Sequence, residues 1–447
     1  MEKVFKDELL ELLEQKNLRK LKEELITFNE ADIAIFIEDL SDLEAVAVFR
    51  ILPKNIAAET FAFFSSEVRN NIINSMTNTE ITEIVDDLYI DDVVDMLEEL
   101  PANVVKKIML NVPNEKRSII NQYLQYPEDS AGSIMTAEFI DIKMKNTVGS
   151  AIRLIRQKAL DSESVYTVYI TDTWRRLVGF VSVRTLLVND DNVKIEDLIE
   201  EDVIYVTTTD DQEYVARQFA KYGFLSLPVV DQEKRLVGIV TIDDAVDVLD
   251  EEATEDFERM AAMTPSEKPY IKSSIWDLSK NRLTWLIFLM LSGTISGMII
   301  GRYEEALAHV VSAASFIPMI MGAGGNAGSQ SSTMIIRGLS IGEIDTGDYA
   351  KIFIKELGVS ILVGIALALV NFLRIILIKP DQPKLAFTVS LALVFTIMIA
   401  KSVGGILPLI AKKLNLDPAL MAAPLITTIV DALSLLVYFY FVKIILL

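Results

Sequence analysis

A single aspartate interrupts the last apolar stretch of the sequence. Asp431 lies in LITTIVDALSLLVYF, and residues 418–430 before it and 432–442 after it are uncharged. An acid at the centre of a bilayer costs about 2.5–3.5 kcal/mol on insertion scales, so it is expected to meet water, a cation or a polar partner. Two interpretations are open. One is a structural hydrogen bond, or an ion pair with Lys401 in the preceding apolar stretch; the other is a cation site on a path across the membrane.

A second set of polar side chains lies in the glycine-rich string GAGGNAGSQSS. Asn326 and Gln330 are four residues apart, so a helix would place them on one pore-lining face. Their side-chain oxygens are suited to holding the waters of a hydrated ion. In one alternative, the glycines and serines serve only close helix packing. In another, they break the helix and turn backbone carbonyls toward the path.

The ligand inventory narrows the choice of cation. The chain has no cysteine and one histidine, His309, so no cluster suits a transition metal. Mg²⁺ commonly keeps several waters and binds through one or two carboxylates. Two copies of Asp431 at a two-fold axis would supply such a pair, so the sequence favours hydrated Mg²⁺.

Acidic residues also gather outside the apolar stretches. One group has helical spacing over residues 91–99, and nine of the 16 residues from 243 to 258 are Asp or Glu. Like charges four residues apart disfavour a helix by about 0.2–0.5 kcal/mol per pair. A solvated acidic face is the usual explanation. The alternative is a switch in which divalent cations bridge the two groups and close the acidic domains, which repel each other without the cation.

These residues belong to four predicted regions. Residues 1–132 form an acidic domain of short helices, whose capping signals recur roughly every 12 residues between 79 and 124. Residues 133–250 alternate strands and helices in a repeat seen twice. Residues 251–278 predict a connecting helix. Residues 279–447 predict a membrane domain with five spans, because uncharged stretches occur at 283–301, 310–336, 357–373 and 385–400, and the fifth stretch holds only Asp431.

The charge balance separates a soluble part from the membrane part. Residues 1–275 carry 54 acids and 29 bases, whereas residues 276–447 carry 10 acids and 13 bases. The soluble part should repel nucleic acid. The N-terminus lacks an apolar leader, so we expect a cytoplasmic N-terminal part and, after five spans, a C-terminus outside the inner membrane. No nucleophile, base and oxyanion set is recognisable, so we expect neither an enzyme nor a protein substrate.

Several longer strings carry a resemblance to a known family. The doubled RLVG-containing unit resembles a tandem pair of CBS domains. The strings YPEDSAGSIMT, LPVVDQEKRLVGIVTIDDAVDV with EEATED, GGNAGSQ and LDPALMAAPLITTIVDALSLL together resemble the MgtE family of bacterial magnesium channels, over nearly all 447 residues. The resemblance implies a homodimer with five membrane helices per subunit, a pore on the two-fold axis with Asp431 as its selectivity site, and a connecting helix that acts as a plug.

The resemblance also implies regulatory sites for Mg²⁺. Asp417, which opens the last span, should couple the plug to the pore. The remaining ligands would lie on the helical domain, the CBS pair and the plug: Glu59, Asp91, Asp95, Asp244, Asp247, Glu252, Glu255 and Asp256.

ATP is a further ligand that the resemblance suggests. The second repeat keeps Thr241 and Asp244 at the spacing used for ribose hydroxyls, but the first has Ser182 and Thr185, and Thr167 replaces a position that is often aromatic. These departures argue against ATP binding. Two other functions stay open beside a gated Mg²⁺ channel. One is a proton-driven cation exchanger in which Asp431 titrates, and the other is a membrane-anchored nucleotide sensor.

Overall fold

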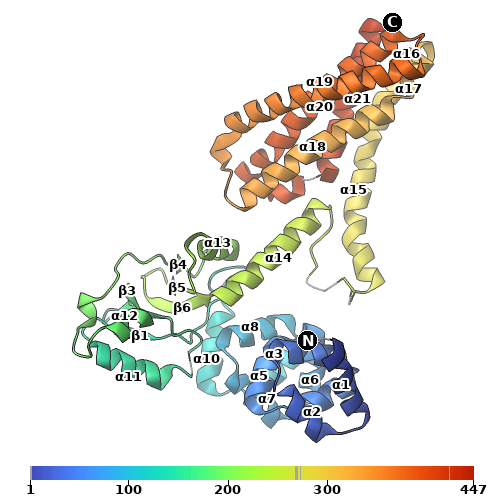
Figure 1. Cartoon of the computed structure of the whole chain (residues 1–447). Helices are drawn as coiled ribbons and strands as arrows, with labels where there is room; N and C mark the ends of the chain where they lie inside the picture. The colour runs from blue at the N-terminus through green and yellow to red at the C-terminus, as the bar shows by residue number, and fades with distance from the viewer. Residues whose placement is uncertain (1–2, 161, 267–269, 272, 422) are drawn as a thin grey trace. The chain divides into compact units, whose positions relative to one another are not determined.

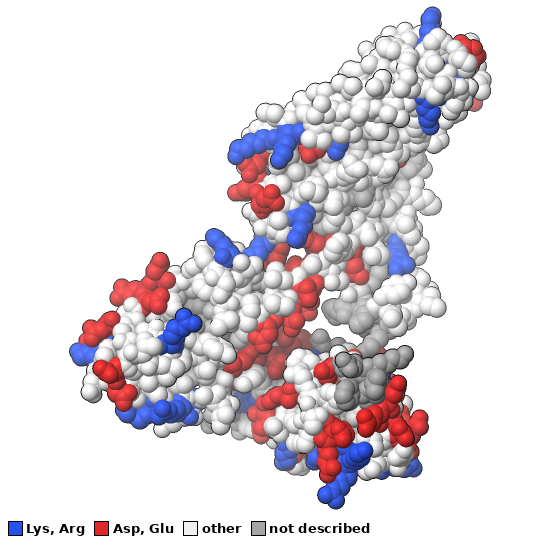
Figure 2. All heavy atoms as spheres, viewed as in Figure 1, with Lys and Arg blue, Asp and Glu red and all other residues white. Residues whose placement is uncertain are grey.

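The computed structural model describes residues 3–160, 162–266, 270–271, 273–421 and 423–447 (Figure 1). The chain divides into two compact units, Met1–Leu249 and Asp250–Leu447. On the face shown in Figure 2, the second unit is largely free of charged side chains, and acidic side chains gather along the connecting helix. The division falls 26 residues before the boundary expected from charge at residue 275, so residues 250–275 group with the membrane helices.

The first unit begins with a stack of ten short helices, which confirms the predicted helical domain. The last carbonyls of a helix lack partners within it, and basic side chains from other helices satisfy several of them here. Lys107 Nζ donates to the carbonyls of Ile73 and Met76, and Lys116 Nζ donates to that of Leu88 at 2.7 Å. The helices are α1 (Lys3–Glu14), α2 (Leu18–Leu25), α3 (Glu30–Glu38), α4 (Asp42–Phe49), α5 (Lys54–Ala62), α6 (Ser66–Ser75), α7 (Asn78–Asp87), α8 (Ile90–Glu99), α9 (Ala102–Asn111) and α10 (Asn114–Tyr123).

Two small sheets follow, and their equal topology confirms the predicted repeat. In each sheet the first strand is parallel to the second, and the second is antiparallel to the third. The hydroxyl groups of Tyr169 and Ser226 share a buried hydrogen bond of 2.9 Å between the two repeats. The elements are β1 (Asp141–Lys143), α11 (Val148–Lys158), β2 (Thr167–Thr171), β3 (Leu177–Ser182), α12 (Val183–Val188), η1 (Ile195–Asp197), β4 (Val206–Thr207), α13 (Gln212–Tyr222), β5 (Ser226–Val230) and β6 (Leu236–Thr241).

The connecting helix is shorter than predicted. Helix α14 spans Ile242–Met260 and ends there, so a helix through residue 278 is wrong. Ala262 has a positive φ of 54°, and Pro265 disfavours helical geometry in the residue before it. The next helix, α15 (Ile275–Arg302), begins after Ser274, whose hydroxyl accepts the backbone N–H of Asp277.

Long helices make up the second unit. Four segments are long and apolar enough to cross a membrane among the residues described: Ile275–Arg302, Thr346–Ile378, Pro383–Lys413 and Pro418–Ile445. Helix α18 (Ile317–Ser340) is 24 residues long, enough to span about 30 Å, but glycine, serine, asparagine and glutamine make it less apolar. Five spans therefore stay a prediction. The other elements are α16 (Glu304–His309), α17 (Val311–Ala314), η2 (Thr346–Asp348), α19 (Tyr349–Ile378), α20 (Pro383–Lys413), η3 (Pro418–Met421) and α21 (Ala423–Ile445).

The glycines of α18 allow close packing without interrupting the helix. A Cβ on Gly325 would lie 2.9 Å from Thr427 Cγ2 of α21, and one on Gly404 of α20 would overlap the carbonyl oxygen of Gly328. Because α18 is continuous, the alternative in which its glycines break the helix is wrong. The packing interpretation explains Gly325 and Gly328 directly.

We expect Gly404→Ala to destabilise the second unit. The added methyl group overlaps backbone, and overpacking of this kind costs about 1–3 kcal/mol. Gly293→Ala in α15 is the matched control, because a Cβ there meets no atom within 4 Å and both substitutions gain the same helix propensity. The measurement is the melting temperature of the purified full-length chain in detergent. Equal melting temperatures for the two variants would contradict the packing seen between α18 and α20.

Candidate functional site

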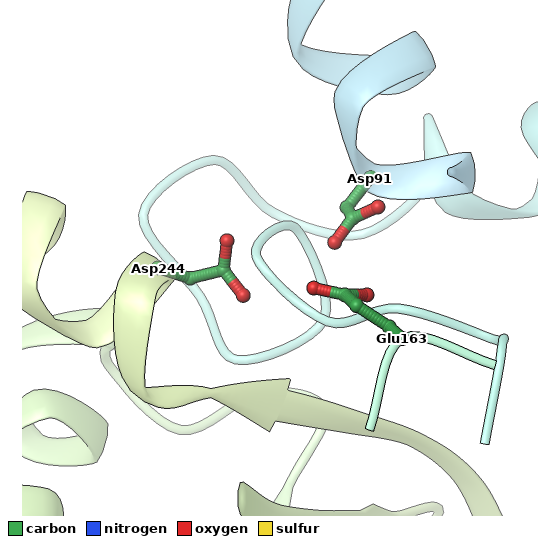
Figure 3. A group of neighbouring side chains, drawn as sticks. All are labelled: Asp91, Glu163 and Asp244. Atoms are coloured by element: carbon green, nitrogen blue, oxygen red, sulfur yellow. The ribbon is translucent and has the colours of Figure 1, made fainter. Parts of the chain in front are cut away.

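Three carboxylates from distant parts of the sequence point toward one another in the first unit (Figure 3). Asp91 lies in the first turn of α8, Glu163 precedes β2, and Asp244 lies in the first turn of α14. One oxygen from each residue lies within 4.8 Å of the others. Three acids at this separation repel one another unless a proton or a cation lies among them.

Local hydrogen bonds hold two of these acids in place. Thr241, at the end of β6, donates its hydroxyl to Asp244 Oδ2 at 2.6 Å. The backbone N–H of Glu163 donates to the carbonyl of Glu138 at 3.0 Å. Asp91 is favoured in the first turn of α8, where the helix dipole attracts an anion. The fold therefore directs all three carboxylates to one point before any ligand arrives.

Two oxygens of this cluster lack a hydrogen-bond partner among the described residues. Asp91 is 6% exposed, and its Oδ1 is buried and unpartnered. Glu163 Oε2 is also buried and unpartnered. Burial of an ionised carboxylate without compensation is strongly unfavourable. A divalent cation coordinated by these oxygens would supply the missing compensation.

The same crowding changes the protonation of the cluster. Burial, followed by the charges of Glu163 and Asp244, raises the pKa of Asp91 well above its ordinary value. Burial and then Asp244 raise the pKa of Glu163 to about 8, and burial raises that of Asp244 to about 6. Near neutral pH the empty cluster therefore holds protons. Because metal ligands must be deprotonated, binding of a cation would displace them.

The structure brings together two of the predicted ligands, Asp91 and Asp244, and adds Glu163, which was not predicted from the sequence. Only an isolated acid in DSES precedes the strand, and nothing in its spacing connects it to residues so far away in the chain. Asp95 lies on α8, and part of its surface is exposed to solvent. Neighbouring atoms still displace water from its carboxylate, and this burial, followed by the charges of Asp92 and Asp244, raises its pKa. Asp247 is exposed, about one turn further along α14.

Other predicted residues of the first unit lie outside this cluster. Glu59 is exposed on α5. Partial burial of its carboxylate and then the charge of Glu30 raise its pKa. The Thr241 hydroxyl, predicted to contact a ribose, donates to Asp244, whose carboxylate faces the other two acids. The contacts at this pair do not test the expectation that the departures in the first repeat disfavour ATP binding.

The C-terminal turns of α14 contact the membrane helices within the second unit. Arg259 forms ion pairs with Glu255, one turn earlier, and with Asp417, just before η3. Ser340, at the end of α18, donates its hydroxyl to Asp256 at 3.2 Å. Asp417 thus contacts α14, and its role in coupling the plug to the pore stays a prediction. The metal-binding roles of Asp417, Asp256, Glu255 and the half-buried Glu252 stay predictions.

Asp431 lies in the ninth position of α21 and is half-buried. Its Oδ1 is enclosed and has no hydrogen-bond partner within the described part of the chain. Lys401 donates to Ser331 and faces Glu356 instead, so an ion pair between Lys401 and Asp431 is wrong. These contacts leave the interpretation of Asp431 as a cation ligand in place.

Asn326 and Gln330 lie on the exposed side of α18, as their spacing predicts. The opposite side of the helix holds the buried residues Gly324, Gly325 and Gly328. The chain therefore separates a packing face from a polar face on one helix, and a pore-lining role for the polar face stays a prediction.

Comparisons with protein families divide the chain in the same way. Residues 317–441 match the MgtE family, described as divalent cation transporters, and residues 28–129 match the MgtE intracellular N domain. Residues 195–251 match the CBS domain. The first sheet has the same strand order as the second, although the family match covers only the second repeat.

Full-length relatives and solved structures agree with these matches. The magnesium transporter MgtE of Thermus thermophilus is 35% identical over 443 residues, 98% of each chain, and that of Bacillus subtilis is 33% identical over 424 residues, 91% of this chain and 92% of the relative. A crystal structure of the cytosolic domain of the Mg²⁺ channel MgtE in complex with ATP is 34% identical, with a TM-score of 0.52, and covers 54% of this chain and 98% of its own. The soluble part of a magnesium transporter gives 32% identity and a TM-score of 0.53, over 56% of this chain and 98% of its own.

We expect Mg²⁺ binding at pH 7 to release protons from the carboxylate cluster. The raised pKa values keep protons on the empty cluster, and ligation displaces about one proton per cation. Calorimetric titrations of the full-length chain in two buffers of different ionisation enthalpy measure the number released. Glu163→Gln should reduce the release, because one of the protonated acids is gone, whereas Glu201→Gln, at an exposed acid, should keep it. Affinity should rise between pH 6 and 8.5, and a pH-independent affinity without proton release would contradict the assignment.

Proposed function

Because this chain belongs to the MgtE family, we propose that it conducts Mg²⁺ across a membrane along a path lined by Asp431. The observation that carries the proposal is the enclosed Oδ1 of this lone acid in the apolar part of α21, which has no hydrogen-bond partner in the described part of the chain. A carboxylate in that position gains compensation from a passing cation. The relatives that match nearly the full chain are named magnesium transporters, which supports Mg²⁺ as the ion.

The proposed path forms between two copies of the chain. Mg²⁺ prefers few carboxylates and many waters, and one Asp431 from each copy of a homodimer supplies two carboxylates on the two-fold axis. Such a site holds the ion through its hydration shell and does not require the ion to become bare. Asn326 and Gln330 would contact those waters from the polar face of α18.

The proposed direction of transport is uptake across the inner cell membrane. The helical and CBS domains lie in the cytoplasm and the C-terminus lies outside, in keeping with the match to an intracellular N domain. In this orientation the carboxylate cluster of Asp91, Glu163 and Asp244 contacts the cytosol and measures its Mg²⁺ concentration.

We further propose that cytosolic Mg²⁺ closes the path. Without a cation, the protons and remaining negative charge on the cluster leave its carboxylates without a ligand that joins all three. A bound cation displaces the protons and draws α8, the segment before β2 and α14 together. Helix α14 carries the effect, because it begins at this cluster and its last turns hold Asp256 and Arg259 against Ser340 and Asp417. A cation that binds the closed state more tightly than the open state shifts the population toward closure.

Replacing Asp431 by Asn should reduce Mg²⁺ flux by about tenfold or more, since each 1.4 kcal/mol of lost interaction is about a factor of ten. The measurement is Mg²⁺ uptake by proteoliposomes that contain the purified chain. Asp381→Asn, at an exposed acid between α19 and α20, is the control. Wild-type flux in the Asp431 variant would refute the pore assignment. Flux that follows an imposed pH gradient would favour the proton-driven exchanger instead.

The variant D91N/E163Q should keep its flux at low internal Mg²⁺ but lose inhibition as internal Mg²⁺ rises. Two of the three carboxylates are then neutral, so the cluster neither repels strongly nor binds the cation. The same proteoliposomes, loaded with a series of internal Mg²⁺ concentrations, give the inhibition curve. E201Q serves again as the control, and an unchanged curve in D91N/E163Q would remove this cluster from the gating mechanism.

A further inference from the structure

A buried lysine lies among three helices of the second unit. Lys401 of α20 is 5% exposed, and its Nζ donates to Ser331 Oγ of α18 at 3.2 Å. The same Nζ lies 3.9 Å from Glu356 Oε2 of α19. The Ser331 hydroxyl donates to that carboxylate oxygen at 2.5 Å, which completes a triad of amine, hydroxyl and carboxylate.

The surrounding helices leave room for this triad. A Cβ on Gly405, which follows Lys401 by one turn, would lie 3.1 Å from Glu356 Cγ. The Glu356 side chain is 17% exposed, so it is largely covered although it is an acid in an apolar unit. The absence of a side chain at Gly405 therefore lets Glu356 approach α20 and reach the lysine.

The triad lies in the same layer of the helix packing as Asp431. A Cβ on Gly328 of α18 would lie 3.3 Å from the carbonyl oxygen of Ala400 and 3.2 Å from Val430 Cγ2. These residues directly precede Lys401 on α20 and Asp431 on α21. Lys401 and Asp431 therefore each follow a residue that contacts α18 at Gly328, where α18 packs against α20 and α21.

Charges at this depth act over a longer range than they do in water. Coulomb interactions grow as the dielectric falls, and an unpaired cation would repel any other cation nearby. An unpaired anion would attract it and hold it longer. Two opposite charges close together produce little electrostatic potential at a distance. The electrostatic potential that acts on a cation in this layer therefore depends on whether Lys401 and Glu356 are both charged.

We propose that Lys401 and Glu356 form a charge-compensated pair that tunes how tightly a cation is held at the level of Asp431. Ser331 bridges the pair and holds it to α18. The negative charge of Glu356 cancels the positive charge of Lys401, which would otherwise repel the cation. The positive charge of Lys401 in turn cancels that of Glu356, which would otherwise bind the cation too tightly for release. The proposal rests on the proposed function, in which Asp431 lines the cation path.

The test is the concentration of external Mg²⁺ that gives half-maximal uptake by proteoliposomes of the full-length chain at low ionic strength. Glu356→Gln leaves a net positive charge and should raise this concentration by about tenfold. Lys401→Met leaves a net negative charge and should lower it. The double variant K401M/E356Q should return close to the wild-type value, because neither charge remains.

A purely structural role for the triad predicts a different pattern. Both single variants would then shift the half-maximal concentration in the same direction, and the double variant would stay as impaired as the worse single one. That result would overturn the proposal. Ser402→Ala is the matched control, since it removes a hydroxyl group beside Lys401 that donates to the backbone carbonyl of Met398, lies outside the triad and keeps both charges. It should leave the half-maximal concentration near that of the wild type.

Two further measurements keep the test decisive. Melting temperature and size-exclusion behaviour in detergent show whether each variant folds, and Lys401→Gln replaces Lys401→Met if the latter does not. A wild-type chain that moves no Mg²⁺ would overturn both proposals. A wild-type chain that transports, with single variants that shift alike, would overturn only the charge pair.

Discussion

The functional parts of this molecule depend on how the charge of buried carboxylates is compensated. A buried anion needs a proton, a hydrogen-bond donor or a cation, and the chain uses different solutions at different places. Lys401 faces Glu356, and Arg259 pairs with Asp417, so at these points the chain supplies its own cation. At the cluster around Asp91 and at Asp431, an enclosed oxygen has no partner among the residues described. The first kind of site joins helices through an internal ion pair, and the second kind is suited to an exchangeable ion.

Helix α14 contributes residues to both kinds of site. Its first turn contributes Asp244 to the open cluster, and its last turn contributes Arg259 to a closed ion pair. A helix transmits displacement along its axis because its backbone hydrogen bonds are internal. The acids between these ends disfavour the helix through mutual repulsion, so its conformation depends on how much of that charge is compensated.

Much of this arrangement could be predicted from the sequence, because periodicity and capping are local. The stack of short helices, the doubled sheet and the apolar helices all follow from patterns within a few dozen residues. Asp91 and Asp244 were expected to act together, but Glu163 was not, since only the packing of the fold brings it near them. The uncharged stretch at 357–373 begins directly after Glu356, and the structure includes this acid in α19 beside Lys401. Pro265 is a local signal for the end of α14, because proline disfavours helical geometry in the residue before it.

The energetics of closure limit what one open cluster can do. A ligand present at 100 times its dissociation constant stabilises the state it binds by about 2.7 kcal/mol. Shifting a two-state equilibrium from 1:99 to 99:1 needs about 5.5 kcal/mol of differential binding. Under the proposed gating, a single cluster at this ligand concentration would supply about half of the requirement. A homodimer carries two copies of the cluster, and if both close together their contributions add to the required amount. Pairing two copies of the chain would thus have two effects. It would place two Asp431 carboxylates on one axis, and it would add the binding energies of two carboxylate clusters in one conformational change.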